Sequence, residues 1–427
     1  MSKLLLMLTD SYPYDKGEEF FEQEIPYLNE SFDKVVVVPV RYRVGAEQTR
    51  TLPSSTESYL IPKSRVSHPY LVVLKWLPLI ALERKRMVRY NFRRPITTAI
   101  DLRFAANVKE LYSKIQGILR EIRFSDYDEV VIYSYWCHTG AALGVHIRDI
   151  FLADHPRVKV VSRAHAYDVD EDDTPYRYIP ARKYLLTYLD RVFPISNYAA
   201  AFLHRAMPEA RNKIIVARLG VPGSKPIVRH QTSPFHIVSC SHMAPYKRVG
   251  LLLDSIAELQ KRGEQVYWTH IGEFNEERLE AMRAKAEQLL EPGSYALIGH
   301  QSNESIVNLY EESDFSLFVN VSSGEGVPVT IMEAQSAGLP VLATDAGGTK
   351  EIVIDGVNGR IIPVSSSKET IAEEIQRLMN LSRDTFEEYS IAARQGWATR
   401  SQQSVQYQKM ADFLSKDIWN SDATADL

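Results

Sequence analysis

The stretch 314–349 constrains the fold most, because it reads as two buried strands joined by a helix. Residues 315–319 are a run of bulky apolar side chains, which favours a strand buried in a parallel sheet. A polar loop follows, and Pro328 stands where a helix can begin, since the first helical position tolerates a missing N–H. Gly338 ends the helix before a second strand over 341–344. The pattern predicts a β–α–β unit and therefore an α/β fold.

Two carboxylates bracket Pro328, Glu325 in the loop and Glu333 inside the helix. A glutamate on so apolar a helix is costly unless it is paired or faces a ligand. From Pro328 to Glu333 the helix rises roughly 7–8 Å, at about 1.5 Å per residue, which is about the span of a diphosphate. The open N–H groups of Val329 and Thr330 would hold a diphosphate at the positive end of the helix. The alternative is a capped surface helix of another kind of α/β protein.

The segment EGVPVTIMEAQSAGLPVLATDAGGTKEIV also carries a family signature. It resembles the E-x7-E motif of the retaining GT-B glycosyltransferases, specifically glycosyltransferase family 4 of the polysaccharide-biosynthesis type. The resemblance implies an α/β fold of two Rossmann-like doubly wound domains facing a cleft, with a C-terminal helix that crosses back to the first domain. It implies a metal-independent hexosyltransferase, with Glu333 on the ribose and Glu325 on the sugar.

The length of 427 residues suits two domains of about 200 residues each. The segment 218–226 contains two prolines and two glycines and is interpreted as the linker. We therefore expect an acceptor-side domain over 1–222, a nucleotide-sugar domain over 228–396, and a helix over about 401–420 that returns to the first domain.

The two cysteines, Cys137 and Cys240, lie far apart and are interpreted as free thiols in a reducing compartment. The first apolar run stops at Asp10, so it has the length of a strand and no signal peptide is expected. No apolar segment is long enough to span a bilayer. These features predict a cytoplasmic protein that is soluble or peripheral at the inner membrane face.

The first β–α loop lies within SYPYDKGEEFFEQEIPYL. Gly17 is its only glycine, and Glu18, Glu19 and Glu22 suit the first turn of the helix that follows. In the resembling family this loop is glycine-rich and faces the acceptor and the donor phosphates, so Gly17 is assigned to donor binding. An ordinary β–α turn is the alternative.

Residues 63–123 interrupt the alternation of strands and helices and carry fourteen lysines and arginines against four acidic residues. Because the whole chain has a formal net charge of −4, the local excess of positive charge in this stretch calls for a functional explanation. An apolar run over 70–82 precedes ERKRMVRYNFRR, an order that suits docking on anionic lipid. The alternatives are a solvated helical face and a basic groove for an anionic acceptor. Nucleic acid is not expected, since no nucleic-acid motif accompanies the charge.

Two histidines lie at the ends of successive predicted strands of the first domain: His138 follows the strand 129–136, and His165 lies in 158–173, where a strand runs into a polar loop. Carboxyl ends of parallel strands are where ligands bind, so both are candidates. By resemblance, AHAYD matches the family's strand-end histidine at the reacting centre, which gives His165 a catalytic role and His138 an acceptor-side contact. A structural histidine is the alternative for each. The acidic run DVDEDD that follows predicts a solvated loop and not a metal site.

Basic residues follow the first predicted strand of the second domain, 235–240. The resemblance implies an arginine and a lysine here that neutralise the departing diphosphate. Lys247 matches the lysine, whereas His242 stands at the arginine position, which removes a permanent charge and a bidentate fork. Arg248 is expected to compensate. Four further donor contacts are implied by resemblance: Gly272, Ile298, His300 and Gly326.

The sequence therefore predicts a retaining glycosyltransferase with His165, Lys247 and Glu325 as catalytic residues. It would take the sugar from a UDP- or GDP-linked donor, with no other cofactor, by front-face attack assisted by the leaving phosphate. The acceptor would be a saccharide, lipid-linked, in cell-surface polysaccharide or glycolipid synthesis. The alternatives are a nucleotide-sugar epimerase and a non-catalytic nucleotide-sugar-binding module of GT-B fold.

Overall fold

The computed structural model describes residues 1–14, 17–41, 45–61, 69–83, 87–91, 93–172, 174–273 and 275–420. The chain divides into two compact units, one of Met1–Leu219 together with the chain from Gln406, and one of Gly220–Val405. Of the predicted basic stretch, residues 63–68, 84–86 and 92 lie outside the described residues.

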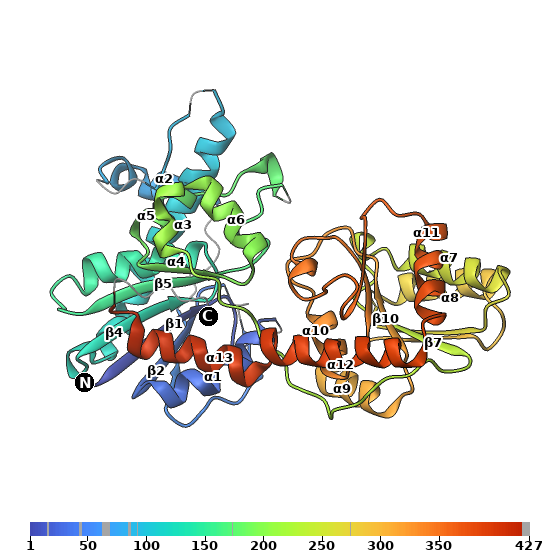
Figure 1. The fold of residues 1–427 in the computed structure, drawn as a ribbon. Helices are drawn as coiled ribbons and strands as arrows, with labels where there is room; N and C mark the ends of the chain where they lie inside the picture. The colour runs from blue at the N-terminus through green and yellow to red at the C-terminus, as the bar shows by residue number, and fades with distance from the viewer. Residues whose placement is uncertain are drawn as a thin grey trace. The chain divides into compact units, whose positions relative to one another are not determined.

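The first unit is built on a parallel sheet of six strands in the order β3-β2-β1-β4-β5-β6 (Figure 1). The strands are β1 (Lys3–Thr9), β2 (Lys34–Pro39), β3 (Thr56–Ser58), β4 (Glu129–Ser134), β5 (Val158–Ala164) and β6 (Arg191–Pro194). Along β1, Leu4 and Leu6 pack into one core cluster, whereas Leu5 and Met7 pack into another. Because β1 is apolar on both faces, it can only lie in the middle of a covered sheet.

The helices that accompany this sheet are α1 (Glu19–Ser31), α2 (Pro69–Ala81), α3 (Pro95–Glu121), α4 (Thr139–His146), α5 (Arg182–Tyr188) and α6 (Asn197–Ala206). Of these, α2 and α3 come from the predicted basic stretch. The stretch is less of an interruption than the sequence indicates, because α3 is the crossover helix between β3 and β4 and packs on α4. Only α2 is additional, and it packs on α3.

The second unit repeats the strand order of the first. Its parallel sheet runs β12-β11-β10-β7-β8-β9, which is again 3-2-1-4-5-6 when its strands are numbered within the unit. The strands are β7 (Phe235–Cys240), β8 (Val266–Ile271), β9 (Tyr295–Ile298), β10 (Leu317–Asn320), β11 (Val341–Thr344) and β12 (Gly359–Ile362). The helices are α7 (Val249–Lys261), α8 (Glu276–Leu289), α9 (Asn303–Glu312), α10 (Val329–Ser336), α11 (Lys368–Met379) and α12 (Arg383–Arg400). The β–α–β unit predicted over 314–349 is therefore confirmed as β10–α10–β11.

The shared strand order fixes where a ligand can bind in each unit. In a doubly wound sheet, ligands bind beyond the carboxyl ends of the strands where the winding direction reverses. That reversal lies between β1 and β4 in the first unit and between β7 and β10 in the second. The predicted site residues follow these strands or their neighbours.

The end of the chain returns to the first unit, through α13 (Gln403–Asp412) and the turn that follows it. Met410, Phe413 and Leu414 are buried in a core cluster of that unit, and the ring centroids of Phe413 and Phe193 lie 5.5 Å apart. The predicted fold class of two Rossmann-like domains with a returning C-terminal helix is confirmed. Within the described residues, no helix combines the length and apolarity that crossing a bilayer requires.

Candidate active site

Lys247 and Glu325 form an ion pair at the winding reversal of the second unit. Lys247 follows β7, Glu325 follows β10, and the lysine Nζ lies 2.7 and 2.8 Å from the two carboxylate oxygens. Asn320 donates from Nδ2 to the same carboxylate at 3.2 Å. Both side chains of the ion pair are largely buried, so removing either partner would leave an uncompensated buried charge. Two of the three predicted catalytic residues are thus in direct contact.

Arg248 supports the loop next to this pair. Its backbone is left-handed, with φ of 51°, and its guanidinium donates to the carbonyl oxygens of Val321 at 2.6 Å, Ser322 at 3.3 Å and Val364 at 2.6 Å. These bonds tie the start of α7 to the segments after β10 and β12. Arg248 therefore has a structural role that the sequence did not indicate, and its contact with a diphosphate stays a prediction.

The loop before α10 is held tightly by two glycines from the segment after β11. Gly348 donates its N–H to the Gly326 carbonyl at 2.7 Å. A Cβ on Gly347, whose φ is +54°, would lie 1.7 Å from the Glu325 carbonyl oxygen, so only glycine fits there. The loop delivers the chain to Pro328, after which Val329 and Thr330 begin α10 with no side-chain cap. The first amides of a helix have no acceptor within the helix, so they are placed to bind an anion.

Glu333 is a buried carboxylate inside α10. Burial raises its pKa from 4.5 to about 7. Within the described part of the chain, no hydrogen bond or ion pair reaches this carboxylate. Burial, and to a smaller extent the charge of Glu333, raises the pKa of the neighbouring Cys240 thiol. An ionised group left like this is costly unless a partner arrives from outside the protein. Glu333 therefore has the properties of a ligand-binding carboxylate.

The other predicted donor contacts of this unit lie at the carboxyl ends of β7, β8 and β9. Gly272 follows β8, with φ of +111°, and a Cβ there would lie 2.4 Å from the Ser241 carbonyl oxygen. His242 is exposed and its Nδ1 lies 3.1 Å from the Glu273 carbonyl oxygen. Ile298 ends β9, and the exposed His300 follows it. The structure thus brings these residues to the same carboxyl edge of the sheet as Lys247.

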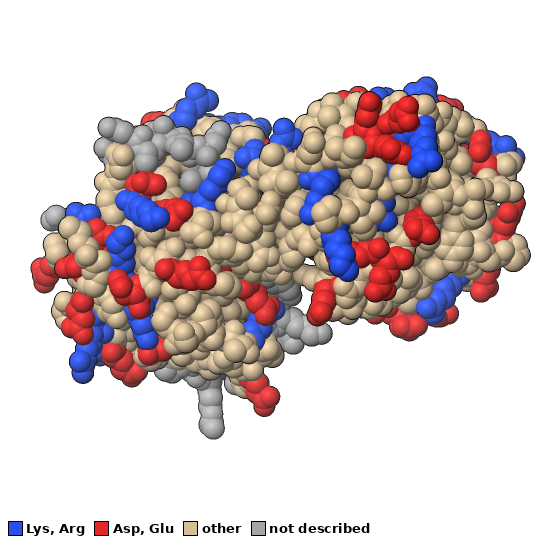
Figure 2. Space-filling model, turned by 60° about the horizontal axis from the view of Figure 1, so that its bottom comes forward, with Lys and Arg blue, Asp and Glu red and all other residues tan. Residues whose placement is uncertain are grey.

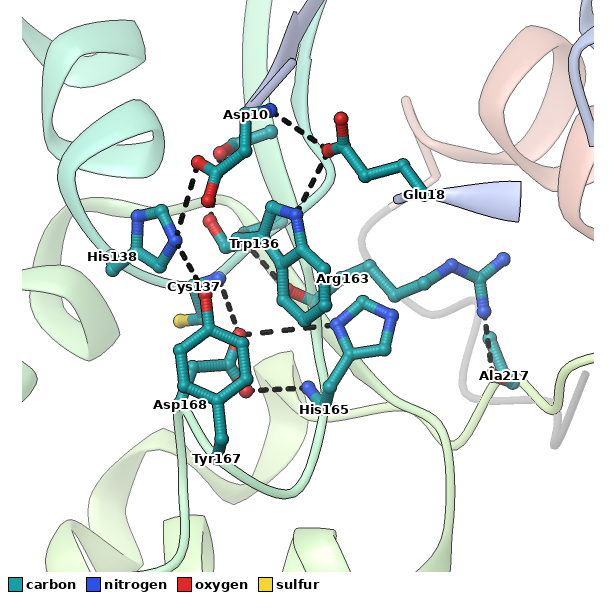
Figure 3. A network of polar contacts seen from close by, with 12 residues as sticks. Asp10, Glu18, Trp136, Cys137, His138, Arg163, His165, Tyr167, Asp168 and Ala217 are labelled. Atoms are coloured by element: carbon teal, nitrogen blue, oxygen red, sulfur yellow. Dashed lines mark hydrogen bonds and ion pairs between the residues drawn. The ribbon is translucent and has the colours of Figure 1, made fainter. Parts of the chain in front are cut away.

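At the winding reversal of the first unit, Glu18 organises the loop after β1. Its Oε1 accepts the Asp10 N–H at 2.8 Å (Figure 3). Its Oε2 accepts the N–H groups of Ser11 at 2.8 Å and Tyr12 at 2.7 Å. Its Oε1 also accepts the indole N–H of Trp136 at 2.8 Å. The sequence indicated only a first-turn helix residue, but Glu18 precedes the helix in a left-handed conformation, with φ of 57°. The one sequence feature that could have indicated this role is the position of Glu18 next to the only glycine of the β–α loop.

Gly17 directly precedes Glu18. Its φ is +103°, and no heavy atom lies within 4 Å of a Cβ built on it. The conformation favours glycine, whereas the space does not demand it. Its predicted donor contact stays a prediction.

His138 and His165 lie together around Trp136 (Figure 3). The His138 Nε2 is 2.9 Å from the Tyr167 hydroxyl and 3.5 Å from Asp10 Oδ1. The ring centroids of His165 and Trp136 are 4.1 Å apart. Both ring nitrogens of His165 are buried and lack a hydrogen-bond partner within the described residues. Asp168 Oδ2 lies 3.9 Å from the His165 Nδ1, beyond hydrogen-bond distance. The Nδ1 of His138 is also buried with no hydrogen-bond partner among the described residues. Buried polar atoms of this kind cost free energy unless something else supplies the partner, so both histidines are placed for ligand contact.

Asp168 is a functional residue that the sequence analysis missed. Its Oδ1 accepts the backbone N–H of His165 at 2.5 Å, and its Oδ2 accepts that of Cys137 at 2.8 Å. It therefore links the ends of β4 and β5 and fixes the backbone under the histidine. Burial raises the pKa of the Cys137 thiol to about 12, which keeps the thiol protonated. Both cysteines are free and buried, as predicted.

The expectation of a solvated acidic loop after His165 is wrong in part. Asp168 and Asp170 are buried, and Asp170 accepts a hydrogen bond from the Tyr198 hydroxyl at 2.6 Å. Glu171 pairs with Arg182 at 2.5 Å. The acids are engaged with donors of the protein, because a loop at a strand end packs against its neighbours. Asp173 lies outside the described residues.

Comparison with known proteins indicates the class of protein to which these two sites belong. The sequence model of the family described as "Glycosyl transferases group 1" matches residues 223–396, which lie in the second unit. The match and the relatives below support a role in glycosyl transfer.

Two relatives carry names from polysaccharide synthesis. The chain is 23% identical over 265 residues to WcaL of Salmonella typhimurium, a glycosyltransferase named for colanic acid biosynthesis, covering 60% of this chain. It is 25% identical over 291 residues to the amylovoran biosynthesis glycosyltransferase AmsK of Erwinia amylovora, covering 64% of this chain. The matched region spans 64% of the length of WcaL and 67% of that of AmsK.

Solved structures share the whole fold. HepE of Anabaena, in complex with UDP-glucose, superposes with a TM-score of 0.62 at 15% identity, covering 96% of this chain and 99% of HepE. TarM superposes with a TM-score of 0.65 at 14% identity, covering 97% of this chain and 99% of TarM. At these identities the likeness shows the two-domain GT-B fold.

Proposed function

We propose that this chain is a retaining glycosyltransferase that moves a hexose from a nucleotide diphosphate sugar to a saccharide hydroxyl. The observation that carries the proposal is the buried, unpartnered carboxylate of Glu333 on the helix whose first amides are uncapped. The names of WcaL and AmsK support a saccharide acceptor. The complex of HepE with UDP-glucose supports a nucleotide sugar as donor. We propose UDP or GDP as the nucleotide.

The second unit would bind the donor. The amides of Val329 and Thr330 would take the diphosphate, and Glu333 would accept hydrogen bonds from the ribose hydroxyls. The remaining donor contacts of this unit would be His242, Arg248, Gly272, Ile298, His300 and Gly326, and Gly17 is the donor contact assigned to the first unit. In this assignment the ribose supplies the partner that Glu333 lacks, which gives a physical reason for keeping a costly carboxylate in an apolar helix.

The ion pair between Lys247 and Glu325 would open when the donor binds, and each residue would then contact a different part of the donor. Lys247 would move its charge to the diphosphate and stabilise it as it leaves, and Glu325 would then accept hydroxyls of the transferred sugar. The bond from the anomeric carbon to the diphosphate oxygen breaks, and the acceptor oxygen bonds to the same face. The acceptor proton passes to the leaving phosphate oxygen. Lys247 and the helix amides supply the positive charge, so the step requires no metal ion.

The first unit would contribute the acceptor side. His165 would hydrogen-bond at the reacting centre through a ring nitrogen that now lacks a partner, and His138 would contact the acceptor. We propose a lipid-linked saccharide as the acceptor, reached at an anionic inner membrane face. The exposed basic residues of the segment before β4 support this location.

A thermal-shift screen of nucleotide sugars tests the donor site. A donor present at 100 times its dissociation constant adds about 2.7 kcal/mol to the free energy of unfolding, so the true donor should raise the Tm. Glu333→Gln should lose that shift, whereas the matched exposed change Glu373→Gln on α11 should retain it. Equal shifts for wild type and Glu333→Gln would contradict the proposal. An epimerised sugar formed without acceptor would favour the epimerase instead.

A further inference from the structure

The helix α2 is apolar around its whole circumference, although only one side of it is buried. It is thirteen residues long, it contains no acidic residue, and Lys75 is its only basic residue. A helix of this composition is normally enclosed by protein or by lipid. Among the described residues of the first unit, α2 packs against α3 and the core beneath it.

The inward side of α2 is well defined. Val72 and Ile80 are buried in the core cluster of the first unit, and Val73 and Trp76 pack against that cluster. The indole N–H of Trp76 donates to Glu110 of α3 at 2.9 Å, and Lys75 pairs with the same carboxylate at 2.7 Å. These contacts fix the rotation of α2 about its axis, so its opposite side is held outward.

The outward side carries large apolar side chains that are between 39% and 79% exposed. Its members are Tyr70, Leu71, Leu74, Leu77, Leu79 and Leu82. Five of these side chains lie on α2 and Leu82 directly follows it. Together they form a largely apolar surface, interrupted by the exposed Lys75, of a kind that marks an interaction site. We call these six residues the outer face of α2.

The charges near this face indicate which partner it fits. Arg89, Arg93 and Arg94, in the segment that joins α2 to α3, are exposed. No acidic residue occurs in α2 or in the described part of that joining segment, apart from Glu83. On the face that Figure 2 shows, basic and acidic side chains are interspersed.

We propose that the outer face of α2 inserts into the interfacial region of an anionic lipid bilayer, with the neighbouring arginines on the lipid phosphates. The helix is about 20 Å long and keeps its inward side on the protein, so it would lie in the plane of the interface. This inference deepens the proposed membrane location: it adds an apolar anchor to the charge attraction. A second copy of the chain is the competing occupant.

Sedimentation with vesicles tests the inference on the full chain. The vesicles are phosphatidylcholine alone or with phosphatidylglycerol, at low salt and at about 1 M salt, where the Debye length is about 3 Å. Wild type should bind the anionic vesicles at low salt and keep a bound fraction at high salt, because burial of leucine side chains is not screened. The double variant Leu71→Gln, Leu74→Gln should bind at least about tenfold more weakly and lose the salt-resistant fraction.

Two matched variants separate the contributions. Arg93→Gln with Arg94→Gln should weaken binding to anionic vesicles at low salt by about tenfold or more while keeping the salt-resistant fraction. Ile391→Gln removes an exposed apolar side chain from α12 of the second unit and should change nothing. Circular dichroism and the donor-induced Tm shift should be the same in all variants, which separates failure of this inference from failure of the donor site.

Two results would overturn the inference. One is wild type that stays in the supernatant with anionic vesicles at low salt. The other is a wild-type dimer, measured by light scattering, that the leucine variant converts to monomer while vesicle binding is unchanged. If the double leucine variant has a lower Tm than wild type, Leu82→Gln takes its place. This substitution alters the most exposed residue of the face and should also weaken vesicle binding.

Discussion

The two units have the same strand order and the same winding reversal, yet two loops beside that reversal are held differently. In the first unit, the Glu18 carboxylate accepts three consecutive backbone N–H groups of the loop after β1, the first strand of the unit. In the second unit, the loop after β10, the fourth strand of the unit, is held at its carbonyl groups by Gly348 and Arg248, and Ser322 and Ser323 donate their own N–H groups to Asn320 and Tyr246. The first amides of α10, by contrast, have no side-chain cap.

The difference indicates how one fold comes to hold two kinds of site. A loop whose donors are filled by its own carboxylate is preformed and has little affinity left for an anion. A helix whose first amides have no cap leaves those donors for a phosphate. We therefore expect changes in the second unit to act on the donor and on the rate, and changes in the first unit to act on the acceptor.

The largest effect on rate is expected for Lys247→Ala. It removes the cation nearest the diphosphate in the proposed mechanism, which should lower kcat by about 10²–10³-fold. Lys368→Ala, an exposed lysine that begins α11, is the matched control. Steady-state kinetics on folded protein checks this. A variant with unchanged kcat would remove Lys247 from the mechanism.

A pair of glycine substitutions should separate the two loops. Gly347→Ala would place a Cβ against the Glu325 carbonyl, so the loop before α10 must shift, with a loss of stability of about 3 kcal/mol or more and no donor-induced Tm shift. Gly17→Ala meets open space and should cost only about 1 kcal/mol from its positive φ. Thermal denaturation measures both. Equal losses would mean that the two loops are held alike.

The pKa of Glu333 predicts a pH dependence in the second unit. Its folded pKa of about 7 exceeds its ordinary value of 4.5, so the folded state holds an extra proton between these pH values and loses stability as pH rises through them. Above pH 7 the ionised carboxylate costs on the order of 3 kcal/mol, which Glu333→Gln should restore. Urea denaturation at pH 5 and at pH 8 measures this. A variant no more stable than wild type at pH 8 would contradict it.

Donor binding should have the opposite dependence. The ionised carboxylate accepts hydrogen bonds from ribose hydroxyls better than the protonated one does, so donor affinity should fall by about tenfold for each unit of pH below 7. Calorimetric titration across pH 5 to 8 measures this slope. A flat profile in wild type, identical to that of Glu333→Gln, would sink the assignment.

The smallest effect is expected for Glu18→Gln. The amide keeps one acceptor oxygen but turns an N–H₂ toward loop donors, so the loop carrying Asp10 and the indole of Trp136 should loosen. We expect KM for the acceptor to rise about tenfold, with the donor-induced Tm shift unchanged. Glu18→Asp, which keeps the charge on a shorter stem, should recover part of the loss. A lost donor shift would show that the loop serves the other substrate.

The β–α–β unit over 314–349 could be predicted because periodicity, Pro328 and Gly338 agree with one another. The grouping of Lys247 with Glu325 could be predicted only as a resemblance, since strand order brings these distant positions together. Glu18 and Asp168 could not be assigned, because a carboxylate that binds backbone amides looks like any loop acid in a sequence. The prediction of a solvated loop after His165 was wrong in part for the same reason, because the partners of its acidic residues, Arg182 and Tyr198, lie on other elements.

The return of the chain to the first unit after Gln406 has a consequence for how the protein is made. Phe413 and Leu414 fill a core that β1 begins hundreds of residues earlier, so the N-terminal half emerging from the ribosome lacks part of its own interior. The contiguous segment Gly220–Val405 can finish first, and the unit that starts first is completed last. A stop codon just before Gln406 should therefore spare the later-made half and leave the earlier one prone to aggregation.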